Sequence, residues 1–449
     1  MTNLITVFEH QTIQQSDFVI QTDFHWLLAQ IEVGQLPCFR IGYAGQVVVK
    51  VNHYLAVIRL PSGTVLEVLP KISKDAVGNQ SQTRQWVLQM LEDIYGLTAQ
   101  PLDMLSTGQT KSNFLNNEQS TTWLQPLIKI WCGLLRQLPT LLPRHYQQAM
   151  QNNPQAQGKL LIKEQINHNA HRPHYRYTSQ QQLDLHPLWG QFFLTALQKL
   201  NALGMSDINL PSDVMPAVET IVLSKAILPA QQWQASYQQL KQLLLASKAQ
   251  RDTYSWQQLD MAIELAWLIL QMKKNLNTHP VLGTDFVPAV MIDMQQAFER
   301  WVSIKLADSV KGRVQTQKSF TWLQSEGDKA YHRALKPDVL IYPQDMTLPT
   351  AAQPLVVADV KYKAITQLKQ ISSADLYQLY TYQQFLQAEQ AWLIYPISEG
   401  VTQPVSLQTL PLGNLKKTEE TDSCKQSTQP KIRLIPFDVM TGKILFKNN

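Results

Sequence analysis

Two short stretches near the C-terminus, 337-PDVLIY-342 and 354-PLVVADVK-361, decide how this chain is interpreted. Each places an aspartate beside an apolar run typical of a buried β-strand: Asp338 precedes the first run, and Asp359 lies in the second. Side chains alternate along a strand, so Asp359 and Lys361 would share one face. If the strands are neighbours, Asp338 joins them at one end of a sheet. Two carboxylates and an amine so arranged could hold Mg²⁺ and activate a water against a phosphodiester.

The same pattern has simpler explanations. Each aspartate could be solvated at the end of its strand, with Lys361 on the surface. Lys363 lies on the same strand face as Lys361 and could exchange roles with it. The segment between the strands, 343–354, contains three prolines and several polar residues, as expected for the loop of a hairpin. Such a hairpin would bring both aspartates to one place, which favours a functional site over isolated surface charges.

Length and composition set wider bounds. The chain has 449 residues, of which 44% are hydrophobic, enough for two or three domains with apolar cores. The formal net charge of +5 permits contact with nucleic acid without requiring it. The three cysteines, Cys38, Cys132 and Cys424, lie far apart in the sequence. Neither a disulfide framework nor a thiolate zinc site is therefore predicted.

No targeting or membrane segment is expected. Residues 1–5 lack the basic and apolar regions of a signal peptide. The longest apolar stretch, 263–272, is interrupted by Glu264 and Gln271 and is shorter than a membrane helix. We therefore expect a protein of the reducing cytoplasm that does not bind membranes.

Hydrophobic patterns predict a multidomain α+β protein with three parts. Residues 1–115 are expected to form a β-rich, partner-binding domain, 116–285 a helical middle region, and 286–449 an α/β domain with a mixed sheet flanked by helices. Within residues 1 to about 80, which should be β-rich, strands are predicted at 46–51, 54–60 and 64–70, and a helix follows at 84–96.

The other two parts are predicted by the same rules. In the middle region, apolar residues at helical spacing predict helices at 123–142, 187–203, 230–245 and 256–276, with one strand at 158–162. In the last part, the predicted order is a helix at 289–308, strands near Val339 and Val356, a helix at 373–387, and strands at 391–395 and 432–435. The polar stretch 416–431 is predicted to be a mobile loop.

The helix before the acidic strands carries a third carboxylate, Glu299. Phe298 and Val302 are four residues apart and would face the core. Glu299 lies beside that face, where it could reach a metal bound by the aspartates. An exposed glutamate paired with Arg300 or Lys305 would fit the same sequence.

The helix after the acidic strands carries Gln378 and Tyr382 on one face, four residues apart. An amide and a phenol in these positions could hold a phosphate or orient the lysine. Ordinary amphipathic packing is the alternative, because tyrosines on helices are often half-buried.

Taken together, these pieces resemble the PD-(D/E)xK nuclease superfamily, and its RecB-like branch in particular. Further stretches are similar to the McrC family: the hairpin 54-YLAVIRL-60 with 66-LEVLPKI-72, then 158-GKL-160, Asp293-Met294 with Phe298-Glu299, and 375-DLYQ-378. The resemblance covers both ends of the chain and is weakest across residues 200–280.

What the resemblance implies is a particular division of labour. McrC proteins are the Mg²⁺-dependent endonuclease subunits of GTP-dependent, methylcytosine-specific (type IV) restriction complexes. Their partner, McrB, is an AAA+ GTPase hexamer that recognises methylated double-stranded DNA. The N-terminal part of McrC stimulates that GTPase, and the C-terminal part cuts DNA. For this chain, removal of residues 1 to about 110 would then abolish stimulation and leave a folded nuclease core.

Carried onto this sequence, the resemblance assigns roles to single residues. Asp338 and Asp359 would bind Mg²⁺, and Lys361 would position or deprotonate the attacking water. Glu299 would complete the metal shell or bind through water. The last two candidates, Gln378 and Tyr382, would support the site.

Two rival functions fit the same residues: a free-standing RecB-like nuclease that needs no partner, and a catalytically inactive assembly factor. A nucleotide site in the chain itself is not expected. Residues 312–319 have the spacing of a phosphate-binding loop, but Gln317 replaces the second glycine and no apolar strand precedes the segment. Because no nucleotide site is expected in this chain, GTP hydrolysis would belong to a separate subunit.

Overall fold

A computed structural model describes most of the chain. The described residues are 3–71, 79–95, 122–155, 157–202, 212–222, 227–247, 253–271, 289–324, 332–344, 353–363, 365, 367–397, 401–408 and 431–446. The predicted loop 416–431 and Cys424 lie outside them, apart from Lys431. The chain divides into two compact units, one formed by residues 1–98, 115–123 and 275–449 and the other by 99–114 and 124–274. The fold is therefore a mixed α+β fold of more than one unit, as predicted.

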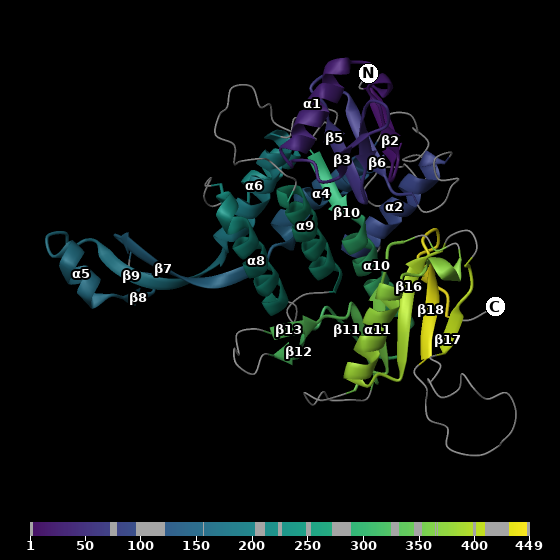
Figure 1. The fold of residues 1–449 in the computed structure, drawn as a ribbon. Helices are drawn as coiled ribbons and strands as arrows, with labels where there is room; N and C mark the ends of the chain where they lie inside the picture. Colours follow the sequence, from purple (N-terminus) through teal and green to yellow (C-terminus); the bar gives the residue numbers. More distant parts are fainter. Residues whose placement is uncertain are drawn as a thin grey trace, which may run out of the picture. The chain divides into compact units, whose positions relative to one another are not determined.

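The first unit begins with two small sheets (Figure 1). One has the strand order β1-β6-β5-β10, and the other β2-β4-β3. The strands are β1 (Leu4–Phe8), β2 (Thr12–Ile13), β3 (Phe39–Tyr43), β4 (Val47–Val51), β5 (Tyr54–Arg59), β6 (Val65–Leu69) and β10 (Ala289–Asp293). The predicted strands 46–51, 54–60 and 64–70 correspond to β4, β5 and β6.

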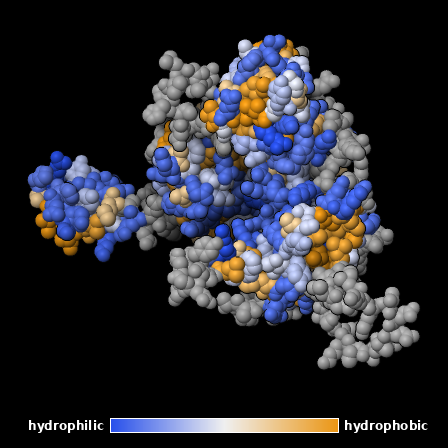
Figure 2. Space-filling model, viewed as in Figure 1, coloured by the Kyte–Doolittle hydropathy of each residue, from blue (hydrophilic) through white to orange (hydrophobic). Residues whose placement is uncertain are grey.

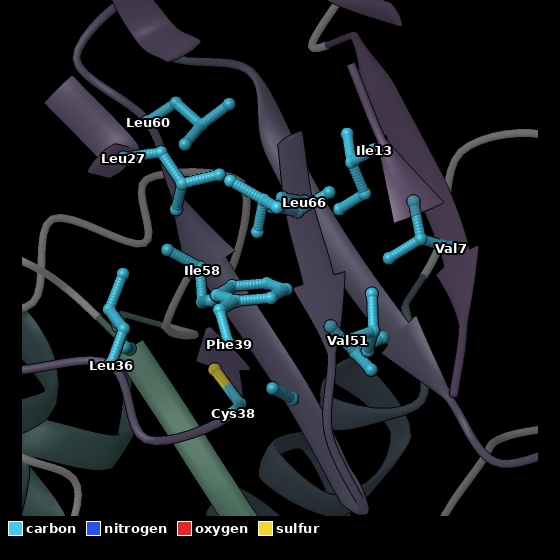
Figure 3. Packing of buried hydrophobic residues seen from close by; sticks show 14 of the residues in the cluster. Val7, Ile13, Leu27, Leu36, Cys38, Phe39, Val51, Ile58, Leu60 and Leu66 are labelled. Atoms are coloured by element: carbon cyan, nitrogen blue, oxygen red, sulfur yellow. The ribbon is translucent and has the colours of Figure 1, made fainter. Parts of the chain in front are cut away.

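The apolar core of these sheets also includes a helix that the sequence analysis missed. Helix α1 (Gln21–Glu32) buries Phe24 and Leu27, within a stretch predicted to be β-rich. Figure 3 shows Leu27 packed with strand residues such as Ile58 and Leu66. The β-rich prediction holds for the stretch as a whole, but the helix was not predicted, because apolar side chains on one face of a short helix resemble those of a strand when the stretch is brief.

Helix α2 (Gln80–Tyr95) joins the N-terminal sheet to the C-terminal part of the same unit. At its start, Arg84 donates from Nη2 to Glu67 on β6 at 2.7 Å, and Glu67 is fully buried. At its end, Asp93 pairs with Lys305 at 2.8 Å and accepts from Trp301 Nε1 at 2.7 Å. The helix is therefore fixed at both ends by buried or half-buried charges.

Helix α10 (Met294–Ser309) is shorter than the predicted helix 289–308. The first five residues of that range form β10, which pairs antiparallel with β5 of the N-terminal sheet. Asp293 caps the helix, because its Oδ1 accepts the backbone N–H groups of Gln295 at 2.9 Å and Gln296 at 3.2 Å. The chain thus completes the N-terminal sheet immediately before it enters the C-terminal part.

A seven-stranded mixed sheet forms the C-terminal part, with the order β11-β14-β15-β16-β18-β17 and β19 paired to β18. Its strands are β11 (Arg313–Thr316), β14 (Val339–Tyr342), β15 (Val356–Val360), β16 (Gln390–Pro396), β17 (Val405–Gln408), β18 (Lys431–Asp438) and β19 (Lys443–Ile444). Residues of β14, β15 and β16 are almost all buried, as expected for strands covered on both faces.

Helix α11 (Ser373–Leu386) follows β15 and precedes the parallel strand β16. Val357 of β15 shares a core with Leu379 of α11, so α11 covers that face of the sheet. Strands β12 (Phe320–Gln324) and β13 (His332–Leu335) form a separate two-stranded sheet. The predicted strands near Val339 and Val356 and the predicted helix 373–387 are confirmed.

The second unit has five helices among its described residues, apart from a short one on its hairpin. They are α4 (Leu124–Leu141), α6 (Pro187–Ala202), α7 (Val214–Glu219), α8 (Trp233–Ser247) and α9 (Thr253–Gln271). The four helices predicted for this region correspond to α4, α6, α8 and α9. Their apolar faces supply the core of the unit, with Trp131 and Trp189 fully buried.

A long hairpin in this unit was not predicted. β7 (Arg144–Asn153) pairs with β9 (Arg176–Leu185) over ten residues, and β8 (Lys159–Leu160) adds a short third strand. Helix α5 (Ile162–Asn169) follows β8. We call β7, β8, α5 and β9 the arm. Both long strands are rich in polar residues, glutamine and asparagine in β7 and glutamine in β9, so they lack the apolar alternation on which strand prediction depends.

The described residues contain no helix that is both long and apolar enough to cross a membrane. Cys38 and Cys132 are buried, and neither forms a disulfide.

Replacing Arg84 with methionine tests the charge pair that holds α2. Glu67 would keep its hydrogen bonds from Thr6 and the Trp123 backbone but lose its buried countercharge. We expect the free energy of unfolding, measured in urea, to fall by about 3–5 kcal/mol. Arg40→Met, at an exposed position on β3, is the control. A loss below about 1 kcal/mol for Arg84→Met would contradict this role.

Candidate active site

The pairing of β14 with β15 sets the geometry of the acidic residues. The strands are antiparallel with Val339 opposite Ala358, and this register continues to place Asp338 opposite Asp359. Directly opposite residues in such a pair have Cβ atoms about 4.5–5.5 Å apart. Asp359 follows Val357 by two residues on β15, so both side chains lie on the same face of the sheet, the face covered by α11. Two aspartates that are far apart in sequence thus become neighbours at one edge of the sheet.

Asp359 is the more buried of the two carboxylates, with 1% of its surface exposed. Lys361 Nζ lies 2.8 Å from its Oδ2 in an ion pair, yet no donor is aligned for a hydrogen bond to that buried oxygen. Burial raises the pKa of Asp359 to about 7, the Asp338 charge adds to the rise, and Lys361 opposes it. The site therefore holds a carboxylate that is poorly compensated without a further cation.

Asp338 is half-buried and bound to the backbone of the neighbouring strand. Its Oδ2 accepts the N–H of Val360 at 2.8 Å. Burial raises the pKa of Asp338, and the charge of Glu299 also raises it, while the Val360 hydrogen bond and Lys361 act in the opposite direction. The hydrogen bond orients this carboxylate toward the residues that flank Asp359.

Glu299 lies within electrostatic range of the aspartates. Burial raises its pKa, and the Asp359 charge adds to that rise. Its Oε1 accepts a hydrogen bond from Gln317 Nε2, and the backbone N–H of Gln317 donates to the Asp338 carbonyl at 3.1 Å. Lys305, one of the alternative partners for Glu299, pairs with Asp93 instead. Gln317, which the sequence analysis considered only for nucleotide binding, thus bridges Glu299 and Asp338.

Gln378 and Tyr382 lie beside the segment that precedes Asp338. Gln378 Nε2 donates to the Tyr382 hydroxyl at 2.7 Å, and that hydroxyl donates to the Lys336 carbonyl at 3.3 Å. Their hydrogen bonds therefore lead to the backbone before Asp338 and not to Lys361.

The two candidate lysines have different partners. Lys361 pairs with Asp359, whereas Lys363 is largely exposed and pairs with Asp375 of α11 at 3.1 Å. Of the two, Lys361 is the lysine at the acidic pair.

Gln295 of α10 also holds the site, and the sequence analysis missed it. Its Nε2 donates to the Val360 carbonyl at 2.9 Å, and its Oε1 accepts the Tyr362 N–H at 3.0 Å. These two bonds flank Lys361 and continue the strand pattern where β15 has ended. The signal in the sequence was slight: Gln295 precedes Glu299 by one helical turn, so both project from one side of α10.

The donor atoms at this edge suit a small hard cation. Carboxylate oxygens are the ligands that Mg²⁺ prefers, and the buried Asp359 Oδ2 has no aligned donor. Among the described residues, no three His, Cys, Asp or Glu side chains form a ready metal-binding cluster. Asp338 and Asp359 thus offer two protein ligands, a number usual for Mg²⁺, which keeps several waters.

The segment 312–319 is not a phosphate-binding loop. Such a loop follows a strand and opens a helix, but here residues Arg313–Thr316 are themselves strand β11. The match in spacing has no structural counterpart, as the sequence analysis concluded.

Comparison with known proteins identifies the family. A family model described as McrBC 5-methylcytosine restriction system component matches residues 49–396, most of the chain. The chain belongs to the McrBC family. The resemblance to McrC found in the sequence is thereby confirmed.

Solved McrBC assemblies also resemble the chain. One is a refined half-complex from a tetradecameric assembly of Thermococcus gammatolerans McrB AAA+ hexamers with bound McrC, with a TM-score of 0.52 and 16% identity over 99% of this chain and 97% of that chain. The other is a Thermococcus gammatolerans McrBC complex, with a TM-score of 0.43 and 16% identity over 69% of this chain and 89% of that chain. No curated protein matches the sequence.

Replacing Asp359 with asparagine should raise the melting temperature in EDTA at pH 8.5. The pKa of Asp359 in the folded chain is about 7, above its ordinary 3.8. The wild type therefore loses stability as the pH rises through this range, and the variant does not. We expect a gain of at least about 2 °C at pH 8.5 and a smaller gain at pH 5, measured by scanning fluorimetry.

The control for this experiment is Asp308→Asn, at an exposed position on α10. A lower melting temperature for Asp359→Asn at pH 8.5 would show that the Asp359 carboxylate stabilises the metal-free fold, contrary to the electrostatics of the site.

Proposed function

We propose that this McrBC family member is a Mg²⁺-dependent DNA endonuclease subunit of a GTP-dependent, methylcytosine-specific restriction complex. One observation carries the proposal: Asp338 and Asp359 lie opposite each other at one sheet edge with Lys361 beside them. This is the arrangement that the PD-(D/E)xK resemblance requires.

Each residue of the site has a role in this proposal. Asp338 and Asp359 would hold Mg²⁺, which polarises a phosphate oxygen and lowers the pKa of bound water. Lys361 would orient the attacking water and stabilise the charge that develops on the phosphate. Glu299 would bind through water, since its carboxylate is already bonded to Gln317.

The remaining residues position these groups. Gln378 and Tyr382 would fix the backbone before Asp338 through the Lys336 carbonyl, and Gln295 would fix the backbone on both sides of Lys361. They act on the geometry of the site without reaching the substrate.

A GTPase partner is the second part of the proposal. The solved half-complex contains McrC bound to McrB AAA+ hexamers, and we infer that this chain assembles with a similar hexamer on methylated double-stranded DNA. A free-standing nuclease would cut without partner or nucleotide. An inactive assembly factor would bind the partner and bind no metal at the acidic pair. These outcomes separate the three functions.

The decisive experiment compares cleavage by wild type and Asp359→Asn. Because the variant keeps the size of the side chain and loses a metal ligand, we expect Mg²⁺ affinity to fall at least about 10–100-fold and cleavage of methylated DNA to be abolished, with partner binding intact. Cleavage and calorimetric Mg²⁺ titration are the measurements, with Asp308→Asn as control. Undiminished cleavage by Asp359→Asn would rule out the proposed site.

Deletion of the N-terminus is a poor test of where the partner binds. The sequence analysis expected that removal of residues 1 to about 110 leaves a folded nuclease core. In the structure, β5 of that segment pairs with β10, and Trp86 of α2 stacks on Trp301 of α10. The structure argues against that expectation, because the deletion would expose β10 and the buried face of α10.

Point substitutions test partner binding without this problem. Two surfaces carry exposed apolar side chains that a partner could cover: Tyr43 and Val47 at the β3–β4 turn, and Ile162 and Ile166 on α5 of the arm. Ile162 and Ile166 are four residues apart and form one stripe, and Figure 2 shows apolar residues gathered on one side of the arm.

We expect one of two matched double variants, Tyr43→Ser/Val47→Ser or Ile162→Ser/Ile166→Ser, to weaken partner binding and GTPase stimulation at least about 10-fold. Loss with the first supports the N-terminal domain as the partner-binding part, as predicted from the sequence. Loss with the second assigns partner binding to the arm. Normal stimulation by both variants would count against a partner contact at either surface.

A further inference from the structure

A polar cavity lies in the same unit as the acidic pair but is lined by other residues. Its volume is about 240 Å³, and it is lined by Glu9, His10, His53, Lys71, Tyr362 and Lys363. These residues come from the end of β1, the β4–β5 turn, the end of β6 and the segment after β15. We call it the basic cavity.

The floor of the basic cavity is uncharged at neutral pH. Glu9 is 1% exposed, and its Oε2 accepts the Lys71 N–H and the Tyr362 hydroxyl, each at 3.1 Å. Its Oε1 is buried without a hydrogen-bond partner. Burial raises the pKa of Glu9 to about 8, so the carboxyl is mainly protonated at pH 7 and cannot neutralise the basic rim.

The rim gathers basic side chains with few countercharges. The exposed rings of His10 and His53 meet edge to face at 4.6 Å. Burial lowers the pKa of His10, and the neighbouring charges of His53 and Lys71 lower it further. Within the described part of the chain, no carboxylate forms an ion pair with His10, His53 or Lys71, whereas Lys363 pairs with Asp375.

A pocket with a neutral floor and a basic, donor-rich rim suits an anion. Lysine and neutral imidazole both donate hydrogen bonds, and a phosphate oxygen supplies the acceptor that this rim lacks. An acidic peptide would need a longer basic surface than this compact cavity offers. A single phosphate group is therefore the ligand that the cavity fits best.

The location of the cavity identifies the source of that phosphate. Lys363 follows Lys361 by two residues, and Pro396, which also lines the cavity, ends β16 beside β15. Asp338 and Asp359 lie at this same edge of the sheet. A strand of DNA whose phosphate reaches the acidic pair would therefore place another phosphate near the basic cavity.

We propose that the basic cavity binds a backbone phosphate of the DNA next to the phosphate that is cut. This inference rests on the proposed nuclease function, since it assumes that DNA crosses this sheet edge. It assigns the contact to the N-terminal residues His10, His53 and Lys71 together with Lys363.

The test is a double variant, His10→Asn/Lys71→Gln, in the full-length chain. Asparagine tolerates the positive φ of His10, 63°, and Lys71 holds Glu9 through its backbone, which the substitution keeps. Lys71→Gln alone is the milder variant if the double variant melts early. The control is Lys311→Gln, exposed beyond the opposite end of β14.

Binding to a fluorescein-labelled methylated duplex is measured by anisotropy over a range of salt, with Ca²⁺ replacing Mg²⁺ to prevent cleavage. The double variant should bind about 10-fold more weakly, and the slope of log K against log[salt] should fall by about one, as for one lost phosphate contact. Lys311→Gln should match the wild type. An unchanged affinity and slope in the double variant would overturn the inference.

Two further arms separate this inference from the nuclease proposal and from a free-phosphate site. Weakened DNA binding by the double variant, with a wild type that does not cut methylated DNA in Mg²⁺ even with the GTPase partner and GTP, would support a phosphate contact at the cavity and refute the nuclease. Inorganic phosphate is titrated by calorimetry as the second arm. Binding of inorganic phosphate at the cavity without any change in DNA affinity would overturn the assignment to DNA.

Discussion

The structure depends on two carboxylates that repel each other and are nevertheless held together. The hydrogen-bond register of β14 and β15 places Asp338 directly opposite Asp359. Burial strengthens the repulsion, and Lys361 and the Val360 N–H oppose it. Metal-free, this edge of the sheet is electrostatically unfavourable, and a divalent cation would relieve it. Binding and catalytic sites often carry an unfavourable electrostatic free energy of this kind, and contacts elsewhere in the fold must stabilise the protein against it.

The compensation comes from the N-terminal part of the chain as much as from the sheet itself. β10 joins the N-terminal sheet and leads directly into α10, which carries Gln295 and Glu299. Helix α2 then holds α10 through Asp93 and the stack of Trp86 on Trp301. Beyond Lys361, Tyr362 is anchored to Glu9. The part expected to bind a partner and the part expected to cut DNA are thus one compact unit.

The basic cavity extends this arrangement along the sheet edge. The acidic pair collects negative charge that needs a cation, and the cavity collects lysine and imidazole hydrogen-bond donors that suit an anion. A nucleic-acid strand supplies the anions, and its metal counterions supply the cations, so both kinds of site can be satisfied by one ligand. The two sites stay distinct because each is assembled from different elements: the acidic pair from β14 and β15 with α10 beside them, and the basic cavity from loops of the N-terminal sheets and the segment after β15.

The sequence by itself determined the strands that carry Asp338, Asp359 and Lys361, because apolar runs bounded by prolines indicate buried strands from local sequence alone. It also determined the family, through short motifs. It also located most helices of the second unit, whose apolar spacing is regular. It indicated the short strand β8 within 158–162, but it did not reveal the two long strands of the arm, which are polar. It also did not reveal the role of β10, whose residues fit the start of a helix equally well. Only the tertiary structure decided that Lys361 and not Lys363 meets the acidic pair, that Gln295 and Gln317 hold the site, and that Glu9 lies under a basic cavity. Each of these features depends on contacts between residues far apart in the chain, and local sequence patterns do not indicate which distant residues meet.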